Sequence, residues 1–268
     1  MYRRTLLRAA GAASLIGMSR PSAAAGGLID EIKARGTLRA GLSTFVPWAM
    51  RDKTGKLIGY ELDVGTRLGA DLGVKYEPMP TAWDGIIPAL LAGSFDIIIG
   101  GMTVTPEREK SVDFTDAYSF TGVGIVANKK TAPGLTTVEA FNRPDFTIVA
   151  RRGTTAAAAA QDKLPKATLR QFDDDAPALQ ELLNGNAMAW VSTAPKPAFA
   201  AVDHADTLYM PVTGVISPQR DAMAIRKGDA AALKVLNDWI AARKADGFLA
   251  ERFHYWFEQR TWLPLVQS

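Results

Sequence analysis

Hydrophobic residues recur along this chain with two alternating periods. The segment Asp96–Gly101 carries three isoleucines in succession, a pattern typical of a strand that is covered on both faces. The segment Gly59–Gly73 instead places Val64, Leu68 and Leu72 on one face of a helix and ends in glycine. Strand and helix patterns alternate along the rest of the chain, and this order predicts an α/β fold.

The remaining elements follow from the same two patterns. The predicted strands are Thr37–Leu42, Val74–Pro78, a strand from Asp96, Thr121–Asn128, Phe146–Ala150, Ala187–Ser192 and Met223–Arg226. The predicted helices are Leu28–Arg35, Gly59–Gly73, Thr81–Gly93 with Asp84 as its cap, helices starting at Pro106 and Ala156, Ala176–Asn184, Asp229–Asp246 and Phe248–Gln259. In open sheets of this kind ligands bind beyond the carboxyl ends of the strands, so residues that follow strands are the candidates for a binding site.

One strand-to-helix junction carries an arginine in an unusual place. Thr105 is a plausible N-cap and Pro106 the first helical residue, so unpaired N–H groups gather there and attract an anion. Arg108 falls in the same first turn, where the helix dipole disfavours a cation. This placement indicates either a surface ion pair with Glu107 or Asp113, or an arginine that binds a carboxylate.

Other candidates follow strand ends in the same way. Thr154 or Thr155 would cap the alanine-rich helix and create a second helix start that favours anions, although a simple strand-to-helix junction has the same sequence pattern. Phe45, Trp48 and Trp83 also lie close to strand ends. Aromatic residues there either complete the core or form a pocket wall.

The N-terminus has the order of features found in export signals. Arg3 and Arg4 precede the apolar run Ala9–Met18 and a small-residue site that ends at Ala25, which predicts a twin-arginine signal over residues 1–25. Its removal takes Lys plus Arg from 31 to 27 against 28 acidic residues, so the net charge changes from +3 to −1. The basicity therefore belongs to the signal and gives no case for binding nucleic acid.

The composition suits a mature chain outside the cytoplasm. The chain contains no cysteine, which suits an oxidising envelope and leaves no residue to carry a lipid anchor. No other stretch approaches the roughly 20 apolar residues of a membrane span. We therefore expect an exported protein without a membrane span.

These segments together resemble the family 3 extracellular solute-binding proteins, the polar amino-acid receptors of ABC importers. The resemblance covers nearly all of residues 28–260 and rests on segments 55–63, 83–90, 96–108, 112–118, 152–155 and 224–229. It implies a type II periplasmic-binding fold, with two lobes of mostly parallel sheet flanked by helices and two crossing strands as hinge. Lobe 1 would comprise residues 26–121 and 219–268, lobe 2 residues 122–218, and the ligand would bind between them.

The resemblance also assigns roles to residues. Arg108 would bind the ligand's α-carboxylate with both guanidinium nitrogens. Gly101 and Thr103 would bind ligand through backbone and hydroxyl, and Thr154 and Thr155 would hold the carboxylate from the other lobe. A bidentate arginine with helix-start N–H groups is what a buried carboxylate needs to offset its lost hydration.

Further residues complete the predicted pocket. Phe45 and Trp83 would form aromatic walls around the ligand side chain, with Trp48 close to the first of them. Arg151 and Arg152 would add positive charge beside the pocket, and Arg152 is predicted to be a ligand-binding residue.

Two positions depart from the family pattern. Thr193 stands where the family usually has an aspartate that receives the ligand's ammonium, and Ser43 and Thr44 stand where another aspartate is common. One hypothesis is an organic anion without an α-ammonium, or a ligand whose ammonium binds another acid such as Asp63 or Asp174. The alternative is an ordinary amino acid with a shifted amine contact.

The function implied is a periplasmic receptor that delivers a small carboxylate solute to an ABC permease, acting as a monomer without cofactor or metal. The alternative is an enzyme, because cyclohexadienyl dehydratases resemble this family in fold. Their general acid is a glutamate just after the second-lobe strand, and the matching residue here is Lys196. We therefore expect no enzymatic activity.

Overall fold

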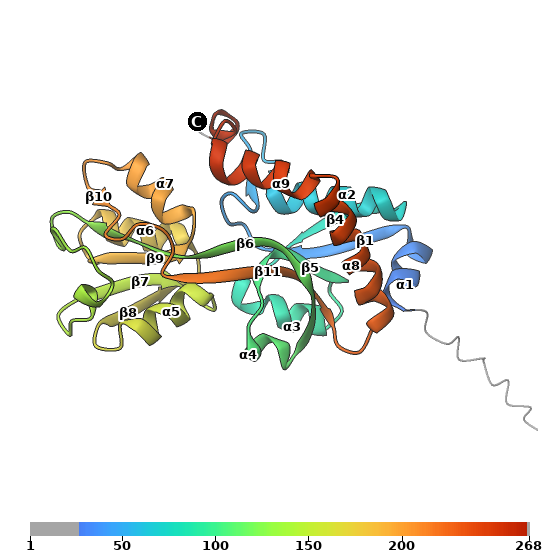
Figure 1. Cartoon of the computed structure of the whole chain (residues 1–268), viewed down its shortest axis with the longest axis horizontal. Coiled ribbons are helices and arrows are strands. Elements are labelled where there is room, and N and C mark those ends of the chain that lie inside the picture. The colour runs from blue at the N-terminus through green and yellow to red at the C-terminus, as the bar shows by residue number, and fades with distance from the viewer. Residues whose placement is uncertain (1–26, 267–268) are drawn as a thin grey trace, which may run out of the picture.

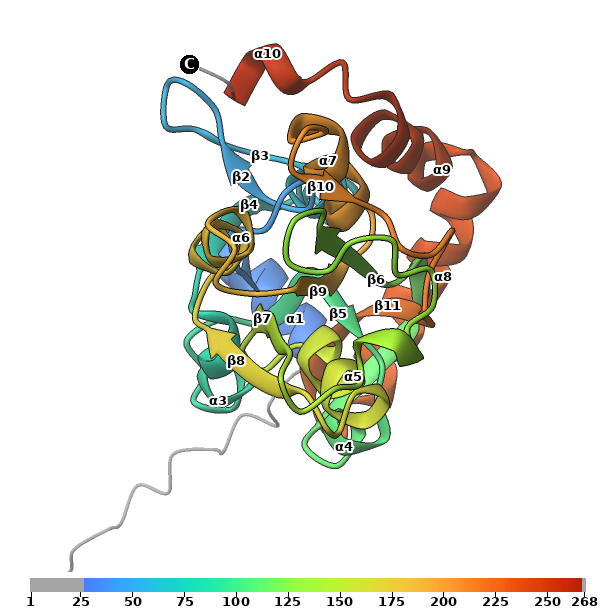
Figure 2. The same ribbon diagram turned by 90° about the vertical axis from the view of Figure 1, so that its left-hand side faces the viewer.

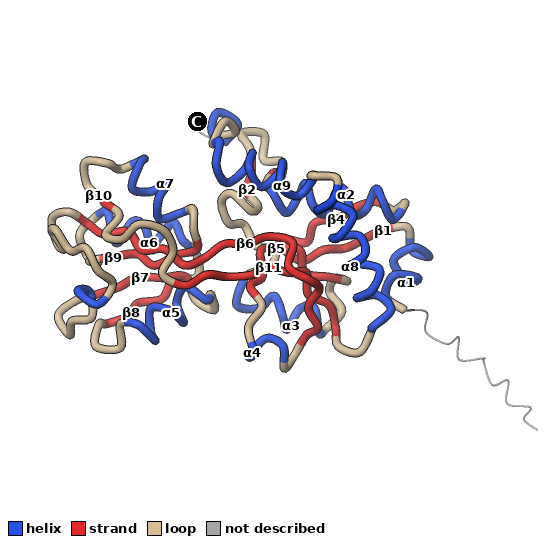
Figure 3. The backbone as a smooth tube through the Cα atoms, in the orientation of Figure 1, coloured by secondary structure: helices blue, strands red, loops and turns tan. Residues whose placement is uncertain are grey.

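The computed structural model describes residues 27–266, and the predicted export signal lies outside the described residues. Two α/β lobes lie at opposite ends of the molecule, and β6 (Val112–Asn128) and β11 (Ser217–Arg226) run from one lobe to the other (Figures 1 and 3). Within residues 27–266 no helix is both long and apolar enough to cross a membrane.

Lobe 1 contains the first half of the chain and the C-terminal helices. Its strands are β1 (Thr37–Leu42), β2 (Met50–Arg51), β3 (Leu57–Ile58), β4 (Lys75–Pro80) and β5 (Ile97–Thr103). Its helices are α1 (Leu28–Arg35), α2 (Tyr60–Leu72), η1 (Trp83–Gly85), α3 (Ile86–Leu91), α4 (Pro106–Glu109), α8 (Ala230–Ala245), α9 (Phe248–Phe253), η3 (His254–Gln259) and α10 (Leu263–Val266).

Lobe 2 contains the middle of the chain. Its strands are β7 (Thr147–Arg151), β8 (Thr168–Phe172), β9 (Ala189–Thr193) and β10 (Leu208–Tyr209), and its helices are η2 (Glu139–Phe141), α5 (Thr155–Lys163), α6 (Asp175–Leu183) and α7 (Lys196–Asp203). Helix α5 covers one face of the strands and α6 and α7 cover the other (Figure 2). The boundaries between lobes at residues 121 and 219 stay a prediction.

Eight strands form one sheet in the order β4-β1-β5-β11-β6-β9-β7-β8, and β10 joins this sheet by pairing with β6. Strands β2 and β3 form a separate two-stranded sheet. Strand β1 pairs in parallel with β4 and β5, and β7 pairs in parallel with β8 and β9. The antiparallel pair of β6 and β11 joins these two parallel groups. Carboxyl ends of strands from both lobes therefore meet at the middle of the molecule, where the lobes face each other.

The largest core cluster explains why the chain returns to lobe 1. Ile97 and Ile99 of β5 pack in one buried cluster with Trp239 of α8 and with Trp256 and Phe257 of η3. The apolar face predicted for the last two helices is thus buried against lobe 1, where the hydrophobic effect holds both ends of the chain in one lobe.

The crossing strands are longer than the sequence pattern predicts. The predicted strand Thr121–Asn128 is only the second half of β6, and Met223–Arg226 is only the end of β11. Their remaining residues include Asp113, Asp116 and Arg220, which interrupt the apolar runs because these parts of the strands are not enclosed by helices on both faces.

Candidate functional site

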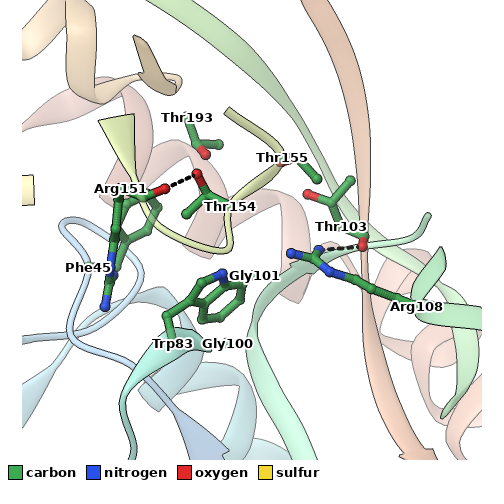
Figure 4. Close-up of a pocket in the computed structure, with 10 residues that line it drawn as sticks. All are labelled: Phe45, Trp83, Gly100, Gly101, Thr103, Arg108, Arg151, Thr154, Thr155 and Thr193. Atoms are coloured by element: carbon green, nitrogen blue, oxygen red, sulfur yellow. Dashed lines mark hydrogen bonds between the residues drawn. The ribbon is translucent and has the colours of Figure 1, made fainter. Parts of the chain in front are cut away.

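A small pocket lies between the lobes, where the carboxyl ends of the strands meet (Figure 4). It occupies about 330 Å³, including the part that is open to solvent. Lobe 1 contributes Phe45, Trp83, Gly100, Gly101, Thr103 and Arg108, and lobe 2 contributes Arg151, Thr154, Thr155 and Thr193. This volume is at the small end of ligand pockets, which suits a small molecule.

Arg108 is held toward the pocket by the start of α4. The Thr105 hydroxyl accepts from the Arg108 amide at 3.2 Å and caps the helix as predicted. The Arg108 guanidinium donates to the Thr103 carbonyl at 2.7 Å and lies 5.6 Å from the centre of the Trp83 ring. Burial lowers the pKa of Arg108 to about 10, so it remains a cation at neutral pH.

The surface ion pair considered for Arg108 does not form. Glu107 pairs with Lys110, and Asp113 pairs with Lys227. Among residues 27–266 Arg108 has no ion-pair partner within 4.0 Å. A partly buried cation in the pocket wall therefore lacks a contacting anion within the protein.

The start of α5 forms the opposite wall. The Thr154 hydroxyl accepts from the Ala157 amide at 3.1 Å and donates to the Arg151 carbonyl at 2.7 Å, so its one proton is used within lobe 2. The Thr155 hydroxyl accepts from Gln219 at 2.5 Å and keeps its own proton for a further partner. The donors on this wall are thus the Thr155 hydroxyl and the unpaired amides of the first helical turn.

Trp48 lies outside the pocket, contrary to its prediction as a site residue. It is only 1% exposed and packs beneath Gly101, where an added Cβ would come within 2.4 Å of the indole. Gly101 has φ +65°, which also favours glycine. Trp48 contacts the Phe45 ring at 4.6 Å between centroids, so it supports the pocket wall from the core.

Arg152 also lies outside the pocket, and Arg151 lines it instead. Successive residues of a strand point to opposite sides, and the side chain that points inward belongs to the last residue of β7. Arg152 is exposed and pairs with Asp173 at 3.0 Å. The Arg151 guanidinium donates to the Ser43 hydroxyl at 2.6 Å and to the Thr44 carbonyl at 3.3 Å, so it links the two lobes.

The two acids suggested as ammonium partners do not line the pocket. Asp63 accepts from the Trp256 indole at 2.7 Å within lobe 1. Asp174 lies 3.2 Å from Arg151 with an exposed carboxylate. No acidic side chain is among the lining residues, and residues 27–266 hold no cluster of three metal-ligating side chains.

Sequence reasoning missed a buried carboxylate behind the pocket wall. Asp221 on β11 is fully buried and accepts from Thr103 at 2.9 Å, Thr121 at 2.7 Å and Ser119 at 3.5 Å. Burial raises the pKa of Asp221 to about 6, although these hydroxyls and the charge of Arg108 oppose the rise. A lone aspartate just before an apolar run is the signal that could have found it.

A second buried carboxylate lies behind Gly101. Glu61 of α2 is fully buried and accepts from the Tyr118 hydroxyl at 2.7 Å, and that hydroxyl accepts from the Gly101 amide at 3.3 Å. The other oxygen of Glu61 has no hydrogen-bond partner. Burial raises the pKa of Glu61 to about 8, so it is largely protonated near neutral pH.

Lys196, the residue that the family resemblance matches to the dehydratase acid, is paired within lobe 2 and also contacts lobe 1. Its ammonium pairs with Asp175 at 2.7 Å and lies 4.3 Å from the centre of the Phe45 ring. Burial lowers the pKa of Lys196, while Asp175 opposes this shift. Asp175 is thus a buried ion-pair partner.

The lobes touch each other directly at Gly153. Its carbonyl accepts from the Trp83 indole at 3.2 Å and from the Arg108 guanidinium at 3.3 Å. A Cβ on Gly153 would lie 3.4 Å from Asp84 of lobe 1. The pocket residues of lobe 1 therefore bind lobe 2 in this conformation, which is a closed one.

Comparison with known proteins relates this architecture to one family. A sequence model of the bacterial extracellular solute-binding proteins, family 3, matches residues 38–259. The L-cystine-binding protein TcyJ of Escherichia coli (strain K12) is 31% identical over 261 residues, which is 95% of this chain and 95% of TcyJ. The cyclohexadienyl dehydratase of Pseudomonas aeruginosa is 24% identical over 238 residues, 87% of each protein.

A solved structure extends the comparison to three dimensions. The ancestral amino acid-binding protein AncCDT-1, a precursor of cyclohexadienyl dehydratase, is 39% identical with a TM-score of 0.79, covering 87% of this chain and 100% of its own. The expected type II periplasmic-binding fold is confirmed by this likeness. The chain belongs to the bacterial extracellular solute-binding proteins of family 3.

Proposed function

We propose that this protein is a periplasmic receptor that delivers a small carboxylate-bearing solute to an ABC permease, and that the solute binds between the two lobes. The proposal includes export by the twin-arginine signal and action as a monomer. The family, and relatives that bind amino acids, support the transport role. The chemistry of binding rests on the pocket.

Arg108 is the observation that carries the proposed carboxylate site. Its guanidinium is protonated, partly buried and without an ion-pair partner among residues 27–266. A cation in such a place is stabilised by an anion that it can bind with two nitrogens at once. A ligand carboxylate would replace the long bond that Arg108 donates to the Gly153 carbonyl.

The opposite wall supplies the remaining donors for that carboxylate. The Thr155 hydroxyl and the first amides of α5 face the pocket, and the helix dipole favours negative charge at this end. Thr154 acts by capping the helix rather than through its hydroxyl. A ligand bound from both lobes would favour the closed arrangement and exclude water.

Phe45 and Trp83 would enclose the rest of the solute. Both rings line the pocket, and the small volume limits the ligand to the size of an amino acid or a related acid. Arg151 and Thr193 complete the polar part of the lining.

A dehydratase activity lacks the group it requires. The alternative is raised by the relative from Pseudomonas aeruginosa, but the position of its expected acid holds Lys196, which is paired with Asp175. The pocket lining offers no carboxyl group as general acid. Incubation with prephenate or arogenate is expected to give no aromatic product, and product formed at enzymatic rates would contradict the receptor proposal.

The carboxylate site is tested by calorimetry and thermal unfolding with L-amino acids, L-cystine and simple carboxylic acids. A ligand at about 100 times its Kd should stabilise the fold by ~2.7 kcal/mol. Arg108→Ala should weaken binding at least about a hundredfold, because a charged bond to the ligand is lost. Arg152→Ala, the neighbouring exposed arginine outside the pocket, is the matched control and should bind as the wild type does. Equal binding by both variants would reject the role of Arg108.

A further inference from the structure

A further contact between the lobes lies away from the pocket. Helix α7 of lobe 2 and helix α9 of lobe 1 lie on the opposite side of the crossing strands from α4 and α5, which hold Arg108 and Thr155 (Figures 1 and 2). Phe199 of α7 packs against the largest core cluster of lobe 1. Phe199 does not line the pocket, so this contact needs no solute to form.

Arg260 makes the polar part of this contact. One terminal nitrogen of its guanidinium donates to both carboxylate oxygens of Asp203, at 2.7 and 2.8 Å. The guanidinium also lies 4.4 Å from the centre of the Phe199 ring. Both partners belong to α7 of lobe 2, and the Arg260 side chain is only 17% exposed. Such a pair contributes more than a fully solvated one, because water screens it less and the ring adds attraction.

The backbone at Arg260 also indicates a role for this side chain. Its φ is +54°, in the left-handed region that glycine and asparagine adopt most readily. No other residue except glycine has a positive φ within residues 27–266. The bend lies between η3 and α10, where the chain passes α7. An arginine in a conformation that favours glycine is offset by the contact its side chain makes.

The segment that follows Arg260 is itself fixed to lobe 1. Trp262 is 1% exposed, and its indole donates to the Trp256 carbonyl at 2.9 Å. Farther along, the Leu265 carbonyl accepts from the Lys53 amide at 3.0 Å, in the turn between β2 and β3. The segment therefore moves with lobe 1, and a bond from Arg260 to α7 restrains lobe 2 as a whole.

We propose that Arg260 is a positioning residue that holds lobe 2 in the closed arrangement, through Asp203 and Phe199, whether or not a solute is present. The inference rests on the proposed function, because it concerns how the lobes close around a solute. A larger closed fraction before binding raises the apparent affinity of a solute that binds the closed arrangement. Arg260 does not line the pocket, so it changes the affinity for every solute by the same factor.

The test measures the distance between the lobes with no solute present. The chain contains no cysteine, so Asp30→Cys in α1 and Asp162→Cys in α5, both at exposed positions, place one spin label in each lobe. Double electron–electron resonance then gives the distribution of distances between the labels. The otherwise unchanged protein should show one main distance, which is that of the closed arrangement.

Arg260→Asn removes the guanidinium but suits the left-handed backbone, and it should lower the ratio of closed to open molecules by about tenfold. Asp203→Asn should shift the distances in the same direction from the other lobe, and the double variant should do no more than Arg260→Asn, because all remove one contact. Arg243→Gln is the matched control. Its guanidinium is also 17% exposed, but its partners Asp71 and Asp246 lie within lobe 1, so the distances should stay unchanged.

Three outcomes would overturn the proposal. The first is an unchanged distance distribution in both Arg260→Asn and Asp203→Asn. The second is an equal shift in Arg243→Gln, which would assign the effect to a general loss of stability. The third is a protein without a main closed distance before any substitution of Arg260. Since no solute is used, a failure of the carboxylate site would appear only in the calorimetry with Arg108→Ala.

Discussion

The two lobes present different kinds of polar group to the pocket. Lobe 1 presents the charged Arg108, and the carboxyl groups of Asp221 and Glu61 lie in the layer behind its wall. Lobe 2 presents the start of α5, with a hydroxyl and backbone amides, and the buried Arg151, whose guanidinium is already bonded to Ser43 and Thr44 of lobe 1. Charged groups fixed by burial discriminate strongly between ligands, whereas helix-start donors add attraction with little selectivity. Ligand choice should therefore depend mainly on lobe 1, and lobe 2 should contribute to closure.

The largest expected difference between the lobes is in the stability lost when a glycine beside the pocket is replaced by alanine, at Gly101 in lobe 1 and at Gly153 in lobe 2. Gly101→Ala should destabilise the fold by at least about 3 kcal/mol, because its Cβ would come within 2.4 Å of the Trp48 indole. Gly153→Ala should cost only about 1 kcal/mol. Both glycines have a positive φ, but a Cβ added at Gly153 would lie 3.4 Å from its nearest neighbour, which is an ordinary contact distance. Urea unfolding of the two variants measures this. Similar losses would show that the backbone angle, rather than the contact with Trp48, explains the glycine.

A smaller effect follows from the buried Glu61. Its pKa is raised from 4.5 to about 8, so the folded protein keeps this proton where the unfolded chain has lost it. The free energy of unfolding contributed by this group is present at low pH and is lost as the pH rises through about 8. Wild-type stability should fall by roughly 3 kcal/mol from pH 5.5 to 8, and Glu61→Gln should flatten the decline. An equally steep decline in Glu61→Gln would assign it to other groups.

The smallest effect is expected on the lobe 2 wall. Thr155→Val removes one hydroxyl donor and should weaken ligand binding about tenfold, whereas Thr155→Ser should bind nearly as well as the wild type. The loss should be the same for amino acids and for amine-free acids, because this wall contacts only the carboxylate. Calorimetry with both compounds checks it, and a selective loss for one class would mean that lobe 2 also chooses the ligand.

The sequence is most informative where local chemistry determines position. Arg108 could be identified as a candidate pocket residue because Thr105 and Pro106 mark a helix start, and an arginine there conflicts with the helix dipole. The alternating elements and the carboxyl-end rule also brought Phe45 and Trp83 to the same sheet edge as Arg108, and the family resemblance added Thr155; all four line the pocket. Helix starts and strand ends can be recognised from residues that are adjacent in the sequence.

The misses depend on long-range packing. Arg151 lines the pocket and Arg152 does not, because β7 ends at Arg151, and the exact last residue of a strand is hard to predict from the sequence. Trp48 packs under Gly101, and these two residues are distant in the sequence and become neighbours only in the folded structure. Asp221 was missed because polar residues interrupt the apolar pattern at the start of β11, so that part of the strand was not predicted. The hydroxyls that bond to Asp221 also lie about a hundred residues away in the chain.

The carbonyl of Gly153 has a consequence for how a solute is held and released. Arg108 and the Trp83 indole both donate to it across the lobes. A ligand carboxylate that binds Arg108 as proposed would have to compete with this internal acceptor, so the measured affinity would report the exchange of one acceptor for another. When the solute dissociates, the Gly153 carbonyl can again accept a hydrogen bond from Arg108, which lowers the free-energy cost of releasing the solute to the transporter.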